Sequence, residues 1–350
     1  MKKWIAFILC LITATSLTAC TRRPGSGDVA NSASVTSAQQ TTAGAAGATT
    51  GASAGNTAAD YLTPILPQIS PPEPAPEELV AEDDELVIVF MGDSQFENGT
   101  ENGTDIASIV GQYTHAHTLN LGMGGTCAAL VKNESASLEN WGSRSFYGVT
   151  LMLQGVASRQ SMEGRPQLAV MESIDPSTVD YYVISYGLND FYNGVPHHIQ
   201  GQESVEWNYY GALGMGMNNL RQISPQAQFI VCTPAYTQFY GKDGAYLGDS
   251  HIYYLNGVTL NEYAEQARHV GYSRNALVLD AAFDTMFNLN STNAHAYLAD
   301  GVHLTERGRQ IYALALSYLI ARGQGWTEQK IEKIDIDHPE WVNGFLEEIP

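Results

Sequence analysis

Four short blocks of the chain carry residue types that together could perform acyl transfer. They are Gly92-Asp93-Ser94, the glycine-rich stretch Asn120–Gly125, Gly187-Leu188-Asn189-Asp190 and Asp300-Gly301-Val302-His303. A nucleophilic serine needs a base, a histidine base needs a carboxylate to orient it, and a tetrahedral intermediate needs hydrogen-bond donors. The blocks supply a hydroxyl, a flexible glycine turn, an amide and an Asp-x-x-His pair, so they predict a site for acyl transfer.

The elements around these blocks predict a fold that would bring them together. Apolar runs occur at Leu86–Met91, His117–Leu121, Tyr181–Ser185, Phe229–Cys232 and Ala276–Leu279. Helical patterns fall between and after these runs, most clearly at Thr259–Val270 and Leu314–Ile320. Such alternation predicts an α/β fold with a doubly wound parallel sheet of about five strands. Active residues of such sheets gather at the carboxyl ends of the strands, where the four blocks lie.

In this order and context the four blocks resemble those of the SGNH/GDSL hydrolase family, over about residues 86–323. The resemblance implies a three-layer α/β/α, flavodoxin-like fold and a serine esterase or acylhydrolase that needs no cofactor. It makes Ser94 the nucleophile, His303 the general base and then acid, and Asp300 the residue that orients His303. The backbone N–H groups of Ser94 and Gly125 and the side-chain amide of Asn189 would form the oxyanion hole.

Three residues in or beside the blocks need a separate interpretation. Gln95 follows Ser94 where the family usually has leucine. This departure is expected to be mild, because that side chain performs no chemistry. Asp93 and Asp190 could be catalytic carboxylates, but hydrogen bonds that stabilise turns are the favoured interpretation.

Composition argues against several other classes of protein. A formal net charge of −20 argues against a nucleic-acid partner, because phosphate binding needs clustered Lys and Arg. The chain has two pairs of closely spaced histidines: His115 with His117, and His197 with His198. Neither pair has an acidic or cysteine partner that would complete a metal site, so no metal is expected. Cys127 and Cys232 lie in apolar surroundings, which favours two buried thiols, although a disulfide is also possible.

The N-terminal quarter is typical of a lipid-anchored protein of bacteria. Lys2 and Lys3 precede the apolar stretch Trp4–Leu17, which is too short for a spanning helix of about 20 residues. This stretch leads into Leu17-Thr18-Ala19-Cys20, which resembles the lipobox that is cleaved before a lipidated cysteine. We therefore expect a signal peptide at 1–19, lipid on Cys20, and an extracytoplasmic protein anchored to the bacterial cell membrane.

The rest of the chain divides into a stalk, one domain and a tail. Residues 20–85 are rich in Ala, Gly, Ser, Thr and then Pro, and they lack apolar periodicity, so a disordered stalk is expected. The hydrolase domain is expected at 86–325. The tail at 326–350 either packs on the domain or contacts a partner, and the sequence identifies no protein partner.

Aromatic residues bear on the substrate. The chain has 19 tyrosines and five tryptophans, many of which follow the third and fourth predicted strands. They are Tyr186, Phe191, Tyr192, Trp207, Tyr209, Tyr210, Tyr236, Tyr240, Tyr246, Tyr253 and Tyr254. Such rings suit sugars but also ordinary packing. The leading hypothesis is an esterase for short acyl groups on a small or polysaccharide carbohydrate ester. The alternatives are a lysophospholipase or lipase-like acylhydrolase, an acyltransferase, and a non-catalytic surface binding module.

Overall fold

The computed structural model of the protein describes residues 85–131, 137–282, 288–331, 334 and 343–350. The signal peptide, Cys20 and the stalk that the sequence predicts lie outside the described residues. All described residues belong to one folded unit. None of the helices in these ranges combines the length and apolarity that crossing a membrane requires.

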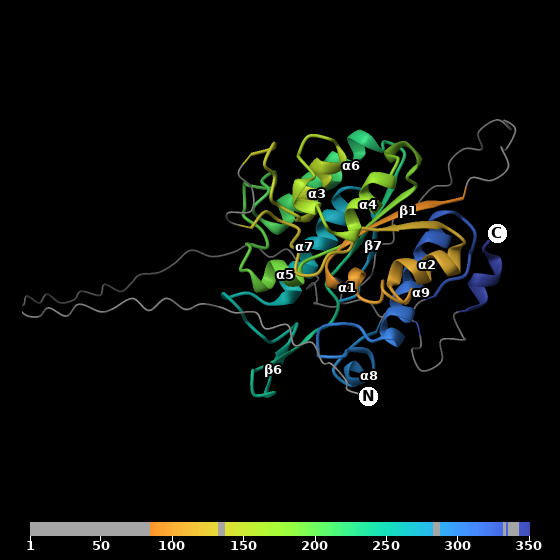
Figure 1. Cartoon of the computed structure of the whole chain (residues 1–350). Coiled ribbons are helices and arrows are strands. Elements are labelled where there is room, and N and C mark those ends of the chain that lie inside the picture. Colours follow the sequence, from red (N-terminus) through yellow and green to blue (C-terminus); the bar gives the residue numbers. More distant parts are fainter. Residues whose placement is uncertain (1–84, 132–136, 283–287, 332–333, 335–342) are drawn as a thin grey trace, which may run out of the picture. The chain divides into compact units, whose positions relative to one another are not determined.

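A parallel sheet of five strands lies at the centre of this unit (Figure 1). The strands are β1 (Val87–Gly92), β2 (His117–Asn120), β3 (Tyr181–Ser185), β4 (Gln228–Cys232) and β7 (Leu277–Leu279). Their order is β2-β1-β3-β4-β7, and the register sets Gly92 opposite Ser185 and Cys232 opposite Leu279. The strands therefore end together at one edge, and the predicted doubly wound α/β fold is confirmed.

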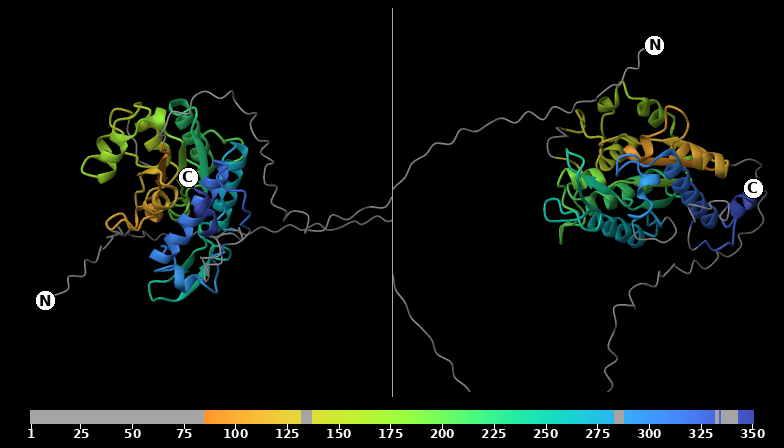
Figure 2. Two further views of the ribbon diagram at one scale, coloured as in Figure 1. Left: turned by 90° about the vertical axis from the view of Figure 1, so that its right-hand side faces the viewer. Right: turned by 90° about the horizontal axis from the view of Figure 1, so that it is seen from below.

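Helices cover both faces of the sheet, which gives the three layers (Figures 1 and 2). Ile88 and Phe90 of β1 belong to the core beneath α2 (Ile106–Thr114) and α9 (Glu306–Gly323). Val89 and Met91 of the same strand belong to the core beneath α3 (Phe146–Leu153), α6 (Tyr209–Ile223) and α7 (Leu260–Ser273). Both sets of side chains are buried, which explains why the strand sequences are continuously apolar rather than alternating.

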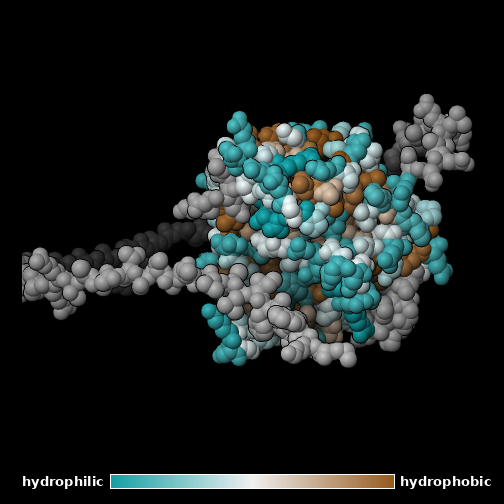
Figure 3. All heavy atoms as spheres, viewed as in Figure 1, coloured by the Kyte–Doolittle hydropathy of each residue, from teal (hydrophilic) through white to brown (hydrophobic). Residues whose placement is uncertain are grey.

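Shorter elements connect these layers. They are α1 (Ser94–Glu97), η2 (Gln160–Met162), α4 (Pro166–Ser173), η3 (Pro176–Thr178), α5 (Leu188–Tyr192), α8 (Ala294–Tyr297) and η5 (Asn343–Glu348). An antiparallel hairpin of β5 (Gln238–Tyr240) and β6 (Tyr246–Asp249) follows β4 and was not predicted. On the face shown in Figure 3, hydrophobic residues are interspersed with hydrophilic ones.

Capping residues fix the ends of the two helices that the sequence predicted. Thr259 and Glu262 form the expected capping box at the start of α7. Thr305 caps α9 by accepting a hydrogen bond from the backbone N–H of Gly308, so this helix begins well before the predicted segment Leu314–Ile320.

The described part of the C-terminal tail packs on the domain. Phe345 is fully buried, and its ring lies 5.5 Å from that of Tyr318 on α9, centroid to centroid. The Tyr318 hydroxyl also donates a hydrogen bond to the carbonyl of Gln329 at 2.9 Å. Of the two roles that the sequence left open for the tail, packing on the domain holds for these residues.

Candidate active site

Ser94 lies at the carboxyl end of β1, on the first turn of the short helix α1. Asp93 caps this turn by accepting a hydrogen bond from the backbone N–H of Gln95 at 3.0 Å. Gly92 is required here because a Cβ at this position would lie 2.6 Å from the ring of Phe96. The chain therefore turns sharply from strand to helix and leaves the Ser94 hydroxyl half-buried at the edge of the sheet.

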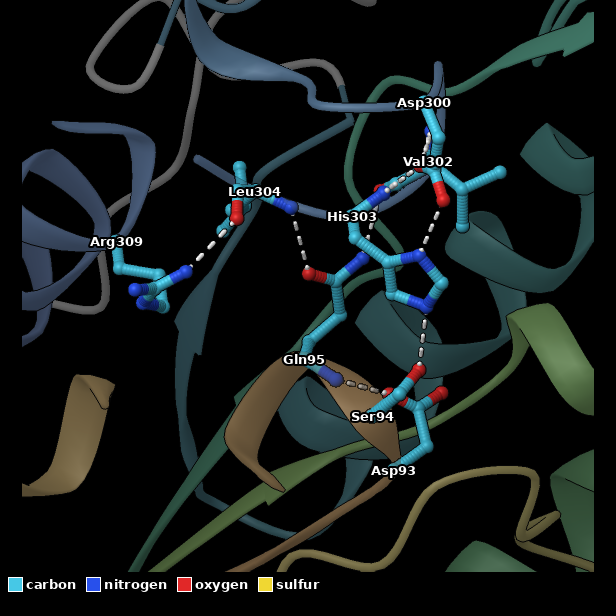
Figure 4. A network of polar contacts seen from close by, with 8 residues as sticks. All are labelled: Asp93, Ser94, Gln95, Asp300, Val302, His303, Leu304 and Arg309. Atoms are coloured by element: carbon cyan, nitrogen blue, oxygen red, sulfur yellow. Dashed lines mark hydrogen bonds and ion pairs between the residues drawn. The ribbon is translucent and has the colours of Figure 1, made fainter. Parts of the chain in front are cut away.

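His303 and Asp300 come from the segment before α9 and meet Ser94 (Figure 4). The Ser94 Oγ lies 2.9 Å from His303 Nε2, and His303 Nδ1 lies 2.7 Å from Asp300 Oδ2. A carboxylate only accepts, so Nδ1 carries the proton and a neutral imidazole presents Nε2 as the acceptor for the serine hydroxyl. The structure thus brings the three predicted triad residues into one continuous chain of hydrogen bonds.

The Asp300 carboxylate also organises its own turn. Its Oδ1 accepts the backbone N–H groups of Val302 at 2.9 Å and of His303 at 2.8 Å. Partial burial alone would raise the pKa of Asp300, but these bonds and the His303 side chain outweigh it and lower the pKa. Gly301 has a φ of +87°, which an L side chain rarely adopts, and its Cα faces the ring of Tyr240.

Asn189 lies on α5, just past β3, and connects two parts of the site. Its Nδ2 donates to Asp93 Oδ2 at 3.2 Å and to the carbonyl of Thr126 at 3.1 Å. Both amide hydrogens are therefore engaged within the protein, and an oxyanion would have to share one of them. The contacts nevertheless place this amide between the nucleophile turn and the glycine turn, and its role in the oxyanion hole stays a prediction.

The glycine turn after β2 lies beside Ser94. A Cβ on Gly124 would be 3.6 Å from the Cβ of Ser94, and the Gly124 N–H donates to Glu97 Oε2 at 2.7 Å. Gly125 has a φ of +77°, and apart from its chain neighbours no heavy atom of the described residues lies within 4 Å of the position that its Cβ would take. The glycine turn thus lies next to the serine. The hydrogen bond from the Gly125 N–H to an oxyanion stays a prediction.

The two buried aspartates accept hydrogen bonds from turns, as predicted. Asp190 accepts the backbone N–H groups of Ala128 at 2.8 Å and of Ala129 at 3.1 Å. Burial raises the pKa of Asp190 to about 7 and that of Asp93 to about 6, although the hydrogen bonds to their carboxylates partly oppose this. Both acids therefore hold the backbone around the site rather than facing a substrate.

The remaining candidate groups lie apart from the triad. Cys127 and Cys232 are buried thiols and form no disulfide with each other, and burial raises the pKa of Cys232 to about 12. His198 Nε2 lies 3.6 Å from Glu203, an acidic neighbour that the sequence analysis did not foresee. Within the described ranges, no group of three His, Cys, Asp or Glu residues could hold a metal ion.

The aromatic residues that were expected near the site divide into two sets. Five are in the core: Tyr186, Phe191, Tyr209, Tyr210 and Tyr236. Five are exposed by 46% or more: Tyr192, Trp207, Tyr240, Tyr246 and Tyr254. Tyr253 is half-buried. The five exposed residues, and in part Tyr253, are accessible to a ligand.

The chain is similar to known proteins in sequence and in fold. A protein-family model described as the GDSL-like lipase/acylhydrolase family matches residues 90–311. No curated protein matches the chain. One solved structure is 22% identical, with a TM-score of 0.50, and the match covers 68% of this chain and 97% of that one.

Two further solved structures carry a functional description. A possible lipase from Chitinophaga pinensis DSM 2588 is 18% identical with a TM-score of 0.47, over 69% of this chain and 100% of its own. A carbohydrate acetylesterase from Sinorhizobium meliloti is 13% identical with a TM-score of 0.41, over 68% of this chain and 99% of its own. At such identities a structural likeness concerns the fold and not the substrate.

Proposed function

The chain belongs to the GDSL-like lipase/acylhydrolase family, and from this premise we propose that it is a serine esterase that removes a short acyl group, such as O-acetyl, from a carbohydrate. Hydrolysis of an ester bond follows from the family. The observation that carries the catalytic assignment is the chain of hydrogen bonds from Ser94 through His303 to Asp300, at 2.9 Å and 2.7 Å.

In the first half-reaction the Ser94 Oγ forms a bond to the ester carbonyl carbon while its proton passes to His303 Nε2. Asp300 stabilises the resulting imidazolium through Nδ1–H. The carbonyl oxygen becomes an oxyanion and accepts hydrogen bonds from the oxyanion hole. The bond to the alcohol oxygen then breaks, and Nε2 returns the proton to that oxygen, which leaves an acyl-enzyme.

In the second half-reaction a water molecule attacks the acyl-enzyme. His303 Nε2 takes a proton from this water as the new carbon–oxygen bond forms, and then returns it to the Ser94 Oγ as the acid leaves. The same three residues therefore serve both steps, and neither step draws on a cofactor.

Exposed tyrosines beside the triad support a carbohydrate substrate. The ring of Tyr240 lies against Gly301, a residue that stands between Asp300 and His303 in the sequence. Tyr246 lies next to it across the β5–β6 hairpin, with ring centroids 5.7 Å apart. Each of the two is about half exposed, at 47% and 50%. Rings that combine an apolar face with a hydroxyl suit the faces and hydroxyls of a sugar.

A small cavity lies next to the nucleophile turn. It is lined by residues that include Asp93, Gln95, Ser185, Leu304 and Tyr312, and its volume of about 20 Å³ holds about one water molecule.

The location of the enzyme is also part of the proposal. We place it outside the cytoplasm, anchored to the bacterial membrane by lipid on Cys20 and raised from it by the stalk. The lipobox-like Leu17–Cys20 and the Pro-rich segment support this, and both lie outside the described residues. An enzyme in that position would meet extracellular polymers, which agrees with a polysaccharide ester as substrate.

Two measurements test the proposal. Hydrolysis of nitrophenyl esters of increasing chain length should be fastest for acetate and fall steeply beyond butyrate. Acetate should be released from at least one of a panel of acetylated polysaccharides, and Tyr240→Ala with Tyr246→Ala should raise KM for that polymer but not for nitrophenyl acetate. A preference for long acyl chains would instead identify a lysophospholipase or lipase-like enzyme.

A further inference from the structure

Gln95 follows the nucleophile in the chain, yet its side chain binds the segment that carries the base (Figure 4). Its Nε2 donates a hydrogen bond to the carbonyl of Val302 at 2.8 Å. Its Oε1 accepts the backbone N–H of Leu304 at 3.3 Å. These two peptide groups flank His303 on either side, so one amide spans the residue that acts on Ser94.

The orientation of this amide follows from its partners. The Val302 carbonyl can only accept a hydrogen bond and the Leu304 N–H can only donate one, so the oxygen and nitrogen of Gln95 cannot be exchanged. The side chain therefore pairs with the His303 segment as the backbone of a neighbouring strand would. Leucine, which is usual at this position in the family, could make neither bond.

Other contacts hold the same segment from different directions. Arg309 of α9 donates from Nη1 to the carbonyl of Leu304 at 3.0 Å and from Nε to the carbonyl of Thr104 at 2.7 Å. The Ala299 N–H donates to the carbonyl of His303 at 2.8 Å. These bonds attach the segment to α9 and to its own turn, whereas the bonds of Gln95 attach it to the nucleophile turn.

We infer that Gln95 is a positioning residue that sets the distance between Ser94 Oγ and His303 Nε2. Ser94 and His303 lie 209 residues apart in the sequence. Gln95 is bonded covalently to Ser94 and by hydrogen bonds to Val302 and Leu304, the two neighbours of His303. Gly301 adds backbone freedom to the His303 segment, which makes an external attachment useful. This inference rests on the proposed function, because it assumes that the pair performs proton transfer.

The test removes the amide and keeps the shape. Methionine has a similar length and volume but cannot make these hydrogen bonds. In Gln95→Met, kcat on nitrophenyl acetate should fall between about 10-fold and about 100-fold, because small displacements of a catalytic group are costly. KM should stay within about twofold, since His303 acts in the transition state rather than in ground-state binding.

Gln154→Met is the matched control. Gln154 also donates from Nε2, to the carbonyl of Asn219 and to Gln222, but it caps the end of α3 and makes no contact with the triad. This variant should keep the wild-type kcat. An equal fall of kcat in both variants would show that any lost glutamine is harmful, and it would overturn the inference.

A second variant tests the donor alone. In Gln95→Glu the carboxylate can still accept from Leu304 but cannot donate to Val302. Protonation restores a donor, so the ratio of the variant kcat/KM to that of the wild type should rise as the pH is lowered towards 5. A ratio that does not rise as the pH is lowered would contradict the donor role.

A spectroscopic readout separates this inference from the proposed function. The downfield proton NMR signal of His303 Nδ1–H, bonded to Asp300, should broaden or disappear in Gln95→Met and persist in Gln154→Met. If the wild-type protein hydrolyses no ester, the proposed function fails while this signal still reports on positioning. If the wild type is active and Gln95→Met matches it in kcat and in the signal, the inference fails alone.

Discussion

Ser94 depends on His303 for its reactivity, because a free serine hydroxyl is a weak nucleophile at neutral pH. The hydrogen bond of 2.9 Å between Oγ and Nε2 places the base within reach of the proton. Asp300 is more exposed than the other two, with 56% of its side chain accessible, and its main service is to fix the ring and tautomer of His303.

Variants of the triad should therefore show unequal and non-additive losses. Ser94→Ala and His303→Ala should each abolish most of the kcat, and the double variant should be about as slow as either one. Asp300→Asn should cost less, because backbone bonds also shape this turn. Steady-state kinetics on nitrophenyl acetate measure all four. Near-wild-type kcat in His303→Ala would mean that another histidine is the base.

The buried acids beside the triad should make stability depend on pH. The unfolded chain ionises Asp190 near its ordinary pKa, whereas burial holds the folded pKa at about 7. The folded state therefore keeps a proton that the unfolded state has lost, so this contribution is complete below pH 4 and is lost as the pH rises to about 7. Asp93, with a pKa of about 6, acts in the same direction.

Urea unfolding at several pH values checks this expectation. The free energy of unfolding of Asp190→Asn should fall less steeply than that of the wild type between pH 4 and pH 7, because the substituted amide does not titrate. Asp243→Asn, in an exposed turn, should follow the wild type. Identical slopes for wild type and Asp190→Asn would refute the role of Asp190.

Among the secondary-structure elements, the central strands β1, β3 and β4 were predictable because nearly all of their side chains are buried. The edge strands β2 and β7 are less buried. Each predicted strand overlaps an observed one, with boundaries that differ by at most one residue. The β5–β6 hairpin gave no such signal, since its strands are short and carry exposed residues such as Tyr240 and Leu247. Apolar continuity detects burial, so it misses elements that stand out from the core.

The candidate site was predictable only where local sequence carries the information. Ser94, Asn189, Asp300 and His303 each lie in a short block at the end of a strand or before a helix, and the structure brings them together. The hydrogen bonds of Gln95 to Val302 and Leu304 were missed, because these partners lie 207 and 209 residues away in the sequence. The one available signal was a glutamine at a position where the family usually has leucine. The sequence alone could not show which groups this glutamine binds.

The end of the chain makes an element-scale prediction of its own. Phe345 on η5 is fully buried against α9, so Phe345→Ala should lower the free energy of unfolding by about 3 kcal/mol. Leu346→Ala is the matched control, because Leu346 is only partly buried and should cost less. Urea unfolding measures both variants. An equal small loss would show that the tail contributes little to stability.

For the whole molecule, the acidic charge and the predicted stalk indicate that anchoring and catalysis should be independent. The net charge of −20 makes attraction to an anionic membrane surface unfavourable, so attachment should depend on a lipid rather than on electrostatics. A diacylglyceryl group supplies two chains, and two hydrophobic signals are what stable anchoring requires.

Replacing Cys20 should therefore release the protein without harming its chemistry. Cys20→Ala should lose metabolically incorporated palmitate and move from the membrane to the soluble fraction, while its kcat on nitrophenyl acetate stays that of the wild type. Cys10→Ala, which changes the other cysteine of the predicted signal segment, should keep both the label and the membrane location. Because the described residues of the folded unit begin at Glu85, a chain shortened to start at Glu82 should likewise keep its turnover. Equal palmitate label in Cys20→Ala and the wild type would contradict the lipid anchor, and a large fall in kcat on shortening would show that the stalk supports the active site.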